Sequence, residues 1–157
     1  MSHKYISLSN TFTLDYPDDW LLEPEPGGII AIFRKGGLFK KNSRNILRIT
    51  PRISDRVISP AIYKAALNLR RKEIQDLEEI ESSPNFLMNF HIIRYRKETY
   101  QDIGERTFLM MEDYWDLIIG NRVFNCFFSI RHDEQDSPQS IEERSIAEQI
   151  LFTLRLL

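Results

Sequence analysis

Cys126 is the single thiol in this sequence of 157 residues, and a cysteine thiolate is a strong nucleophile. The segment Val123 to Arg131 places it on the same side of a predicted strand as Phe124, Phe128 and Ile130. An apolar setting raises the pKa of a thiol and keeps it unreactive. The chain also lacks the Gly-x-Ser-x-Gly turn of many hydrolases. The sequence therefore predicts a structural role for Cys126 and no nucleophilic catalysis.

Metal binding requires ligands that cluster, and the histidines of this chain do not. His3, His91 and His132 lie far apart, and none has a His or Cys neighbour at the spacing of a zinc site. The acids that follow His132 lack the glycine and the spacing of a calcium loop. Gly27-Gly28 and Gly36-Gly37 lack the flanking pattern of a phosphate loop. We therefore predict no metal site and no cofactor.

Two groups of carboxylates could support general acid–base chemistry, Asp18-Asp19 and Glu112-Asp113-Asp116. Such chemistry requires carboxyl groups that converge in a pocket. Asp18 and Asp19 follow a proline and are typical turn residues. Glu112 and Asp113 face opposite sides of a strand, which argues against a shared pocket. We therefore predict no catalytic residue, and an enzyme with an acidic pocket is the third of three hypotheses.

The strongest candidate for a binding site is the basic loop from Arg34 to Arg44, which joins two predicted strands and is longer than a tight hairpin. Loops on a rigid sheet often carry binding residues. A basic loop with an aromatic residue could grip an acidic protein surface, a nucleic acid strand or anionic lipid. The alternative is a solvated loop whose Phe39 folds back on the sheet. The candidate binding residues are Arg34, Lys35, Phe39, Lys40, Lys41 and Arg44.

Composition indicates an ordinary globular protein, because hydrophobic residues make up 42% of the chain and charged residues 28%. The net charge of −2 argues against wholesale binding of nucleic acid. The charges are nevertheless uneven: eight basic residues and one acid lie between Arg34 and Arg56, while acids dominate Glu73 to Glu81 and Asp133 to Glu148. We expect an electrically lopsided molecule.

The expected compartment is the cytoplasm. A single cysteine cannot form an internal disulfide, which fits a reducing environment. Residues Met1 to Asn10 do not resemble a secretory signal. No run of about 18 apolar residues is present that could span a membrane.

Hydrophobic periodicity predicts three strands in the first third of the chain, over Thr11 to Tyr16 with a continuation at Trp20 to Leu22, over Ile29 to Phe33, and over Ile46 to Ile53. Pro51 should lie at an edge or a bulge. A helix should begin at Ser59-Pro60, because serine caps a helix and proline suits its first turn. We expect this helix to continue to Ser82-Ser83-Pro84, because an apolar stripe and an ion pair of Lys72 with Asp76 follow helical spacing. The stripe consists of Tyr63, Ala66, Leu67, Ile74 and Leu77.

Three further strands are predicted over Phe86 to Ile93, Arg106 to Ile119 and Val123 to Arg131, and a last helix begins near Ser137-Pro138 or at Ser140. Its stripe is Ile146, Ala147, Ile150, Leu151, Leu154 and Leu157. Phe152 and Leu156 lie off that stripe and require a cover, which makes this helix a candidate contact surface. The order of three strands, a helix, three strands and a helix predicts one α+β domain over residues 1–157, with a largely antiparallel sheet of about six strands and two main helices.

The segment Phe12 to Trp20, with Tyr16-Pro17 before Asp18-Asp19, resembles the opening of PsbP-like domains. Gly120 to Phe124 resembles a later hairpin of that fold, and Ile146 to Leu154 its last helix. The fold is shared by photosystem subunits, the Mog-type Ran-binding import factor and uncharacterised bacterial proteins, some of them linked to secretion systems. The resemblance implies a three-layer α/β/α sandwich and a non-enzymatic, protein-binding role.

The leading hypothesis is therefore an intracellular bacterial protein that binds another protein, as an adaptor, a chaperone or an immunity-type partner. The second hypothesis is binding of nucleic acid or anionic lipid through the loop 34–44. The identity of the partner and the oligomeric state are left open.

Overall fold

The computed structural model describes residues 1–70, 72–81 and 90–157. Within these residues it contains ten strands and two α-helices. The strands are β1 (Ser2–Ile6), β2 (Phe12–Pro17), β3 (Trp20–Pro24), β4 (Ile30–Arg34), β5 (Ile46–Ile53), β6 (Ile74–Glu81), β7 (His91–Ile103), β8 (Arg106–Ile119), β9 (Arg122–Arg131) and β10 (Arg155–Leu156). The helices are α1 (Pro60–Asn68) and α2 (Pro138–Phe152), with a short 3-10 helix η1 (His132–Glu134) before α2.

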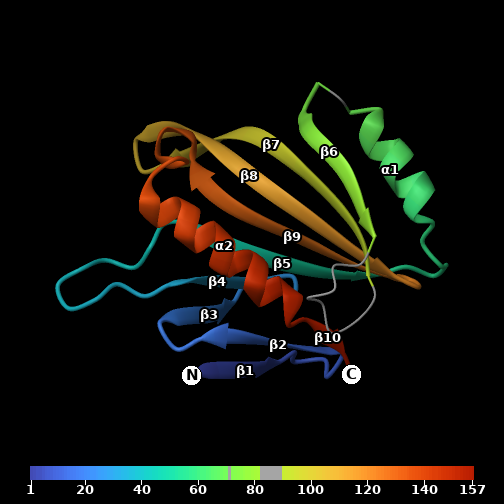
Figure 1. Cartoon of the computed structure of the whole chain (residues 1–157), viewed down its shortest axis with the longest axis horizontal. Coiled ribbons are helices and arrows are strands. Elements are labelled where there is room, and N and C mark those ends of the chain that lie inside the picture. Colours follow the sequence, from blue (N-terminus) through green and yellow to red (C-terminus); the bar gives the residue numbers. More distant parts are fainter. Residues whose placement is uncertain (71, 82–89) are drawn as a thin grey trace.

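Seven of the strands form one sheet in the order β3-β4-β5-β9-β8-β7-β6, and each neighbouring pair is antiparallel. The strands β1, β2 and β10 form a second, antiparallel sheet beside it (Figure 1). Gly120 adopts a φ of 57° in the tight turn between β8 and β9, a conformation that glycine enters without steric cost. The α+β class and the antiparallel sheet are confirmed, with more strands than the six expected.

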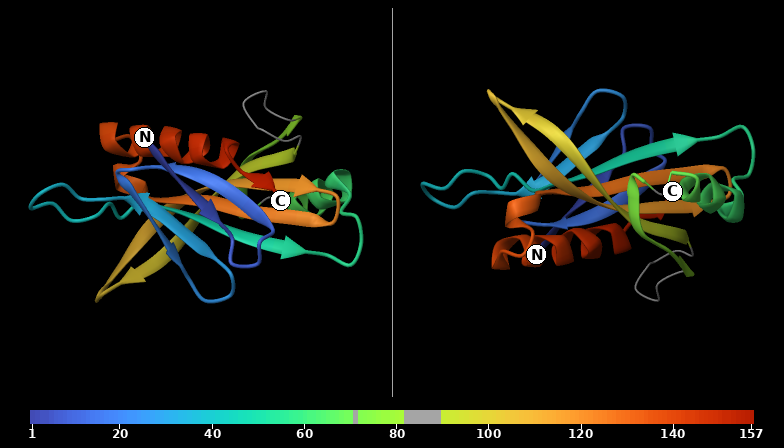
Figure 2. Two further views of the ribbon diagram at one scale, coloured as in Figure 1. Left: turned by 90° about the horizontal axis from the view of Figure 1, so that it is seen from below. Right: turned by 90° about the horizontal axis from the view of Figure 1, so that it is seen from above.

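The main core lies between one face of the large sheet, helix α2 and the small sheet. Trp115, Cys126 and Phe128 on the sheet meet Ala147 and Leu151 of α2 there. A second cluster lies on the opposite, outer face, where Leu67 of α1 packs beside Ile118 and Val123. Helix α2 and helix α1 thus lie on opposite faces of the large sheet, in the α/β/α order that the resemblance implies. Helix α1 covers only one end of the outer face (Figure 2).

The first helix is shorter than predicted. It begins as expected, with the Ser59 side chain accepting a hydrogen bond from the Ile62 amide, but it ends at Asn68. The segment from Ile74 onward is strand β6, so the predicted helical ion pair of Lys72 with Asp76 is wrong. A bulge between Gln75 and Glu78 shifts the register against β7. Because the bulge adds a residue, Ile74 and Leu77 both contact the second cluster, on the outer face of the sheet, although they are three residues apart. A spacing of three is also typical of the apolar stripe of a helix.

The other predicted elements are largely confirmed. Strands β5 and β8 have the predicted bounds, and β9 begins one residue early. The predicted strand Phe86 to Ile93 is only partly correct, because strand β7 begins at His91 and continues to Ile103, well beyond the predicted end. Residues 86–89 of that prediction and the predicted helix end at 82–84 lie outside the described residues. Pro51 lies beyond Ile49, the last residue of β5 that pairs with β4, so β5 has a neighbour on one side only at Pro51, as expected for an edge position.

Helix α2 begins at the first of the two predicted positions, because the Ser137 side chain accepts a hydrogen bond from the Ser140 amide at 3.1 Å. It ends at Phe152, so the predicted helical stripe is wrong for Leu154 and Leu157, which follow the helix. Phe152 and Leu156, which were expected to require a cover, are half-buried against the main core. A role of α2 as a contact surface stays a prediction. No helix in the described part of the chain is both long enough and apolar enough to cross a bilayer.

Candidate functional site

The basic loop between β4 and β5 projects from the body of the protein as an arm, defined here as residues 35–44 (Figure 1). At its tip the Lys40 amide donates to the Gly37 carbonyl at 2.9 Å, which closes a turn. Leu38 is 86% exposed and Phe39 is 101% exposed. The alternative in which Phe39 folds back on the sheet is therefore wrong, and both apolar side chains of the tip face solvent.

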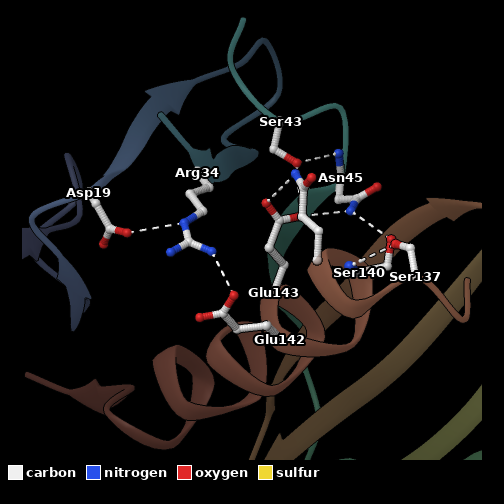
Figure 3. Close-up of polar contacts among 9 residues, drawn as sticks. Asp19, Arg34, Ser43, Asn45, Ser137, Ser140, Glu142 and Glu143 are labelled. Carbon is white, nitrogen blue, oxygen red and sulfur yellow. Dashed lines mark hydrogen bonds and ion pairs between the residues drawn. The ribbon is translucent and has the colours of Figure 1, made fainter. Parts of the chain in front are cut away.

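Arg34 clamps the arm to the body at the end of β4. Its Nε donates to Asp19 Oδ2 and its Nη1 to Glu142 Oε2 of helix α2, each at 3.1 Å (Figure 3). The bond to Glu142 raises the pKa of the Arg34 guanidinium above its ordinary value. Arg34 was predicted as a binding residue, but its charge is shared with two carboxylates of the same chain. The structure places it as an anchor of the arm.

A buried carboxylate forms the second clamp. Glu143 of α2 is fully buried, and its Oε2 accepts hydrogen bonds from Ser43 Oγ at 2.9 Å and from Asn45 Nδ2 at 2.7 Å (Figure 3). Its Oε1 accepts a third bond from Gln139 Nε2 at 3.1 Å, and Asn45 Nδ2 also lies 3.2 Å from Ser140 Oγ. Hydrogen bonds to an ionised group are stronger than neutral ones. The first turns of α2 therefore hold the end of the arm in a fixed position.

The base of the arm is also closed by its own backbone. The Ser43 amide donates to the Arg34 carbonyl at 2.9 Å, and the Gly36 amide donates to Asn42 Oδ1 at the same distance. A Cβ atom at Gly36 would collide with the Lys40 carbonyl oxygen, so only glycine fits there. The arm is thus fixed at its base and leaves its tip in solvent.

The predicted basic residues of the arm divide into two groups. Lys35 Nζ donates to the Asp18 carbonyl oxygen at 2.8 Å and lies against the body. Lys40, Lys41 and Arg44 are exposed and form no ion pair with any residue that the structure describes. Lys40 and Lys41 follow Phe39 directly, so the free charges lie beside the exposed ring. Arg34 and Lys35 therefore belong to the clamped base, whereas Phe39, Lys40 and Lys41 form a free, cationic and apolar tip. Arg44 lies at the base as an unpaired cation among the described residues.

Sequence reasoning missed Glu143 as part of this site. The sequence offers Ser140 as a second possible start of this helix, whereas Ser137 is the cap and Glu143 faces the arm. Its partner Ser43 lies 100 residues away in the sequence, so no local pattern connects them. The one available signal is that a helix beginning at Ser137 places Glu143 on the same side as the buried Ala147 and Ile150.

Cys126 is fully buried, as predicted, and burial raises its pKa well above the ordinary value of a thiol, with a smaller contribution from the charge of Asp116. No group of three or more potential metal ligands occurs among the described side chains. The structural role predicted for Cys126 is consistent with this placement.

The predicted carboxylates on β8 lie on opposite faces of the sheet. Asp113 is nearly buried on the face of α2, where Arg96 Nε donates to its Oδ1 at 2.9 Å. Arg144 Nε lies 2.9 Å from the other oxygen, as an ion pair without hydrogen-bond alignment. Glu112 lies on the outer face and accepts a bond from the Tyr114 hydroxyl at 3.1 Å. Each carboxylate thus has its own partners.

Asp116 forms a buried cluster that fixes α1 to the outer face. Its Oδ2 accepts hydrogen bonds from the hydroxyls of Tyr63, on α1, and Tyr95, on β7, at 2.8 and 2.9 Å. Its Oδ1 accepts a bond from Asn125 Nδ2 at 2.6 Å. Burial raises the pKa of Asp116 to about 6, although the three hydrogen bonds act in the opposite direction. This cluster contributes to the packing of α1 and does not converge with Asp113.

No family model matches the sequence, and no curated protein matches it. Among solved structures, a crystal structure from Bacteroides thetaiotaomicron VPI-5482 has a TM-score of 0.65 at 17% identity and covers 98% of this chain. This chain spans only 48% of the Bacteroides protein.

Two further structures share the fold. The cyanobacterial PsbP protein CyanoP of Synechocystis sp. PCC 6803 has a TM-score of 0.51 at 11% identity, with 99% of this chain and 92% of CyanoP covered. LpqN of Mycobacterium tuberculosis, involved in cell envelope biogenesis, has a TM-score of 0.52 at 14% identity, with 99% and 84% covered. At such identities the likeness shows the fold alone, and the fold is PsbP-like, as the sequence resemblance implied.

Proposed function

We propose that this chain is a non-enzymatic bacterial protein-binding module that grips an acidic partner surface with the tip of its arm. The observation that carries the proposal is the contrast between the two ends of the arm. Its base is clamped by Glu142 and Glu143, while Leu38 and Phe39 at the tip are exposed beside free lysines.

The chemistry of the tip suits a protein partner. Aromatic residues buried in a pocket of the partner supply a large part of the energy of many interfaces. Cations around such an anchor accelerate association with an acidic surface and select against other partners. Because the base is already ordered, binding pays a smaller entropy cost than it would for a disordered loop. The tip of the arm therefore has the composition of an aromatic anchor residue surrounded by cations that steer a partner toward it.

The absence of catalysis is part of the proposal and rests on the described carboxylates. Asp113, Asp116 and Glu143 are buried and each is held by hydrogen bonds or ion pairs within the chain. Carboxylates whose oxygens are already bonded within the chain in this way support packing. The exposed cations of the arm are equally compatible with phosphate ligands, so nucleic acid and anionic lipid enter the test as competing outcomes.

The test is a pull-down from bacterial lysate with the whole chain as bait, after nuclease treatment. One variant carries Leu38→Ser with Phe39→Ser, and a second carries Lys40→Glu with Lys41→Glu. The matched control carries Lys4→Glu with Arg56→Glu, since both side chains are exposed and distant from the arm tip in sequence.

We expect one protein that both arm variants lose and the control retains. If no captured protein is affected, but the arm variants lose binding to purified nucleic acid or to anionic vesicles in separate binding assays, the phosphate-ligand alternative is favoured. Retention of every captured protein by both arm variants would contradict the proposal.

A further inference from the structure

The solvent-facing side of helix α1 is apolar. From Pro60 to Leu69, the residue that caps the helix, every exposed residue is an alanine, an isoleucine or a leucine, and the polar residues Lys64 and Asn68 are half-buried. A surface helix normally turns charged or polar residues to solvent, so α1 has the composition of a helix that something covers. The exposed residues, named here the α1 stripe, are Ala61, Ile62, Ala65, Ala66 and Leu69.

Ile62 and Leu69 dominate the α1 stripe. They are 72% and 89% exposed and lie about two helical turns apart. Ala65 and Ala66 lie between them at spacings of three and four residues, so all four side chains project from one face. From either end, this face presents a large side chain, two small ones and a large one. The pattern is therefore symmetric about the midpoint between Ala65 and Ala66.

A symmetric pattern selects a particular kind of partner. In a two-fold homodimer the same surface serves both copies, so contacts across the axis are made twice. If two α1 helices pack antiparallel about an axis through the midpoint of the α1 stripe, Ile62 of each copy meets Leu69 of the other. The alanines then meet at the centre, where small side chains allow the two helices to approach closely. A surface that binds an unrelated helix requires no such symmetry.

The size of the α1 stripe fits a small dimer interface. Two largely exposed aliphatic side chains and three alanines present on the order of 400 Å² of apolar surface, as functional patches on monomers do. Two copies would bury about 800 Å² of apolar surface, and apolar atoms form about 65% of a homodimer interface. The whole interface would thus measure about 1,200 Å², at the lower limit of specific interfaces. We expect a dimer of modest affinity.

The charges beside the α1 stripe do not oppose this pairing. Lys64 Nζ lies 3.5 Å from Glu79 Oε2. Arg70, which follows the stripe, donates from Nη2 to Glu73 Oε2 at 2.9 Å. Each of these cations is therefore balanced by a carboxylate of its own copy.

We infer that the α1 stripe joins two copies of this chain through an antiparallel pair of α1 helices. The arm and α1 lie at opposite ends of the molecule (Figure 1 and Figure 2). The pairing therefore leaves both arms free and gives the dimer two of them. Two linked binding sites hold a target that offers two sites more tightly than one does. The inference does not depend on the proposed function.

The test is sedimentation velocity of the whole chain over a wide range of concentrations. One variant carries Ile62→Glu with Leu69→Glu, and a second carries Ile62→Lys with Leu69→Lys. The matched control carries Leu8→Glu with Ile141→Glu, at aliphatic residues that are 89% and 54% exposed elsewhere on the surface. Because all the replaced side chains are exposed, each variant should keep the urea unfolding midpoint of the wild type.

We expect the wild type and the control to dimerise with the same Kd. Each stripe variant alone should dimerise roughly a hundredfold more weakly, because like charges then meet across the axis. Mixing the two stripe variants should restore a dimer, since glutamate at one position then faces lysine at the other.

A wild type that stays monomeric at every concentration would overturn the inference. So would a stripe variant that dimerises as well as the wild type, or a control that is weakened as much as the stripe variants. A mixture of the two stripe variants that stays monomeric would overturn the antiparallel pairing. None of these outcomes bears on the arm variants of the pull-down, which test the proposed function separately.

Discussion

Phe39 holds an unusual backbone conformation for an aromatic residue. Its φ of 65° lies in the left-handed region, and its side chain has no cover. Such conformations cost about 1–3 kcal/mol in non-glycine residues and are concentrated at functional sites. Exposure and strain at the same residue favour a role in binding over a role in folding.

Replacing this residue should therefore separate stability from binding. Phe39→Gly removes the ring and the steric cost of positive φ, so we expect the free energy of unfolding to stay constant or to rise by up to about 1 kcal/mol. Partner capture should be lost. Urea unfolding and the pull-down measure the two effects. A large loss of stability would show that the ring packs against the protein.

Glu143 should behave in the opposite way. Whichever way the amide of Glu143→Gln turns, its NH₂ group meets donors, either Ser43 and Asn45 on one side or Gln139 on the other, so at least one donor loses its acceptor. We expect a loss of about 1–3 kcal/mol in the free energy of unfolding, measured in urea. Glu142→Gln, on the exposed neighbour, is the control and should have little effect. Equal effects of the two variants would argue against the buried clamp.

Asp116 predicts a pH dependence of stability. Its pKa is about 6 in the folded protein against an ordinary value of 3.8, so the folded state binds the proton more tightly than the unfolded state. The stability that protonation contributes is complete below about pH 4 and is lost as the pH rises through 6. Its size is on the order of 2–3 kcal/mol.

Asp116→Asn cannot titrate, so its stability relative to wild type should increase between pH 4 and pH 7. Urea unfolding of both proteins at several pH values measures this difference, in which the contributions of other groups largely cancel. A difference that is constant with pH would contradict the account of Asp116.

At the scale of elements, the sequence predicts the strands whose two faces differ clearly. Strands β5 and β8 were predicted with the bounds that the structure has, because each is long and lies inside the sheet. Strand β1 was missed, since four of its five residues are exposed and alternation is absent. Strand β6 was assigned to a helix because its bulge interrupts the alternation of apolar and polar residues that is typical of a strand.

The candidate site was predicted only in part, for a similar reason. The composition of the arm marks it as a basic loop with an aromatic residue. Its clamp depends on contacts of Arg34 and Ser43 with α2, which are separated by 108 and 100 residues in the sequence. Contacts at such separations leave no periodic signal, so the clamp could not be derived from a single sequence.

The arm should be separable from the fold. Replacing residues 36–42 by Asn-Gly shortens the connection and keeps Ser43 and Asn45, so the bonds to Glu143 can still form. We expect thermal stability to be retained, because shorter loops cost less entropy on folding. Partner capture should be abolished. Unfolding of the shortened protein at a much lower temperature would show that the arm is a structural element.

At the scale of the whole molecule, the charges are separated only in part, because Glu142 and Glu143 of the acidic segment Asp133 to Glu148 lie against the base of the arm. The arm extends beside β4 and β5, whereas the acidic strand β6 forms the opposite edge of the large sheet (Figure 1). A separation of charge of this kind orients an approaching partner and makes the association rate sensitive to salt. An acidic partner would thus be directed to the arm. The cytoplasmic location and the single-domain organisation stay predictions.

The measurement that tests the central claim most directly is site-specific photo-crosslinking in living cells. A photoreactive phenylalanine analogue replaces Phe39 in one protein and Ile62, which is 72% exposed on α1, in another. We expect one protein to be crosslinked from position 39 and not from position 62. The same crosslinked proteins from both positions, or none from position 39, would contradict a binding role for the arm.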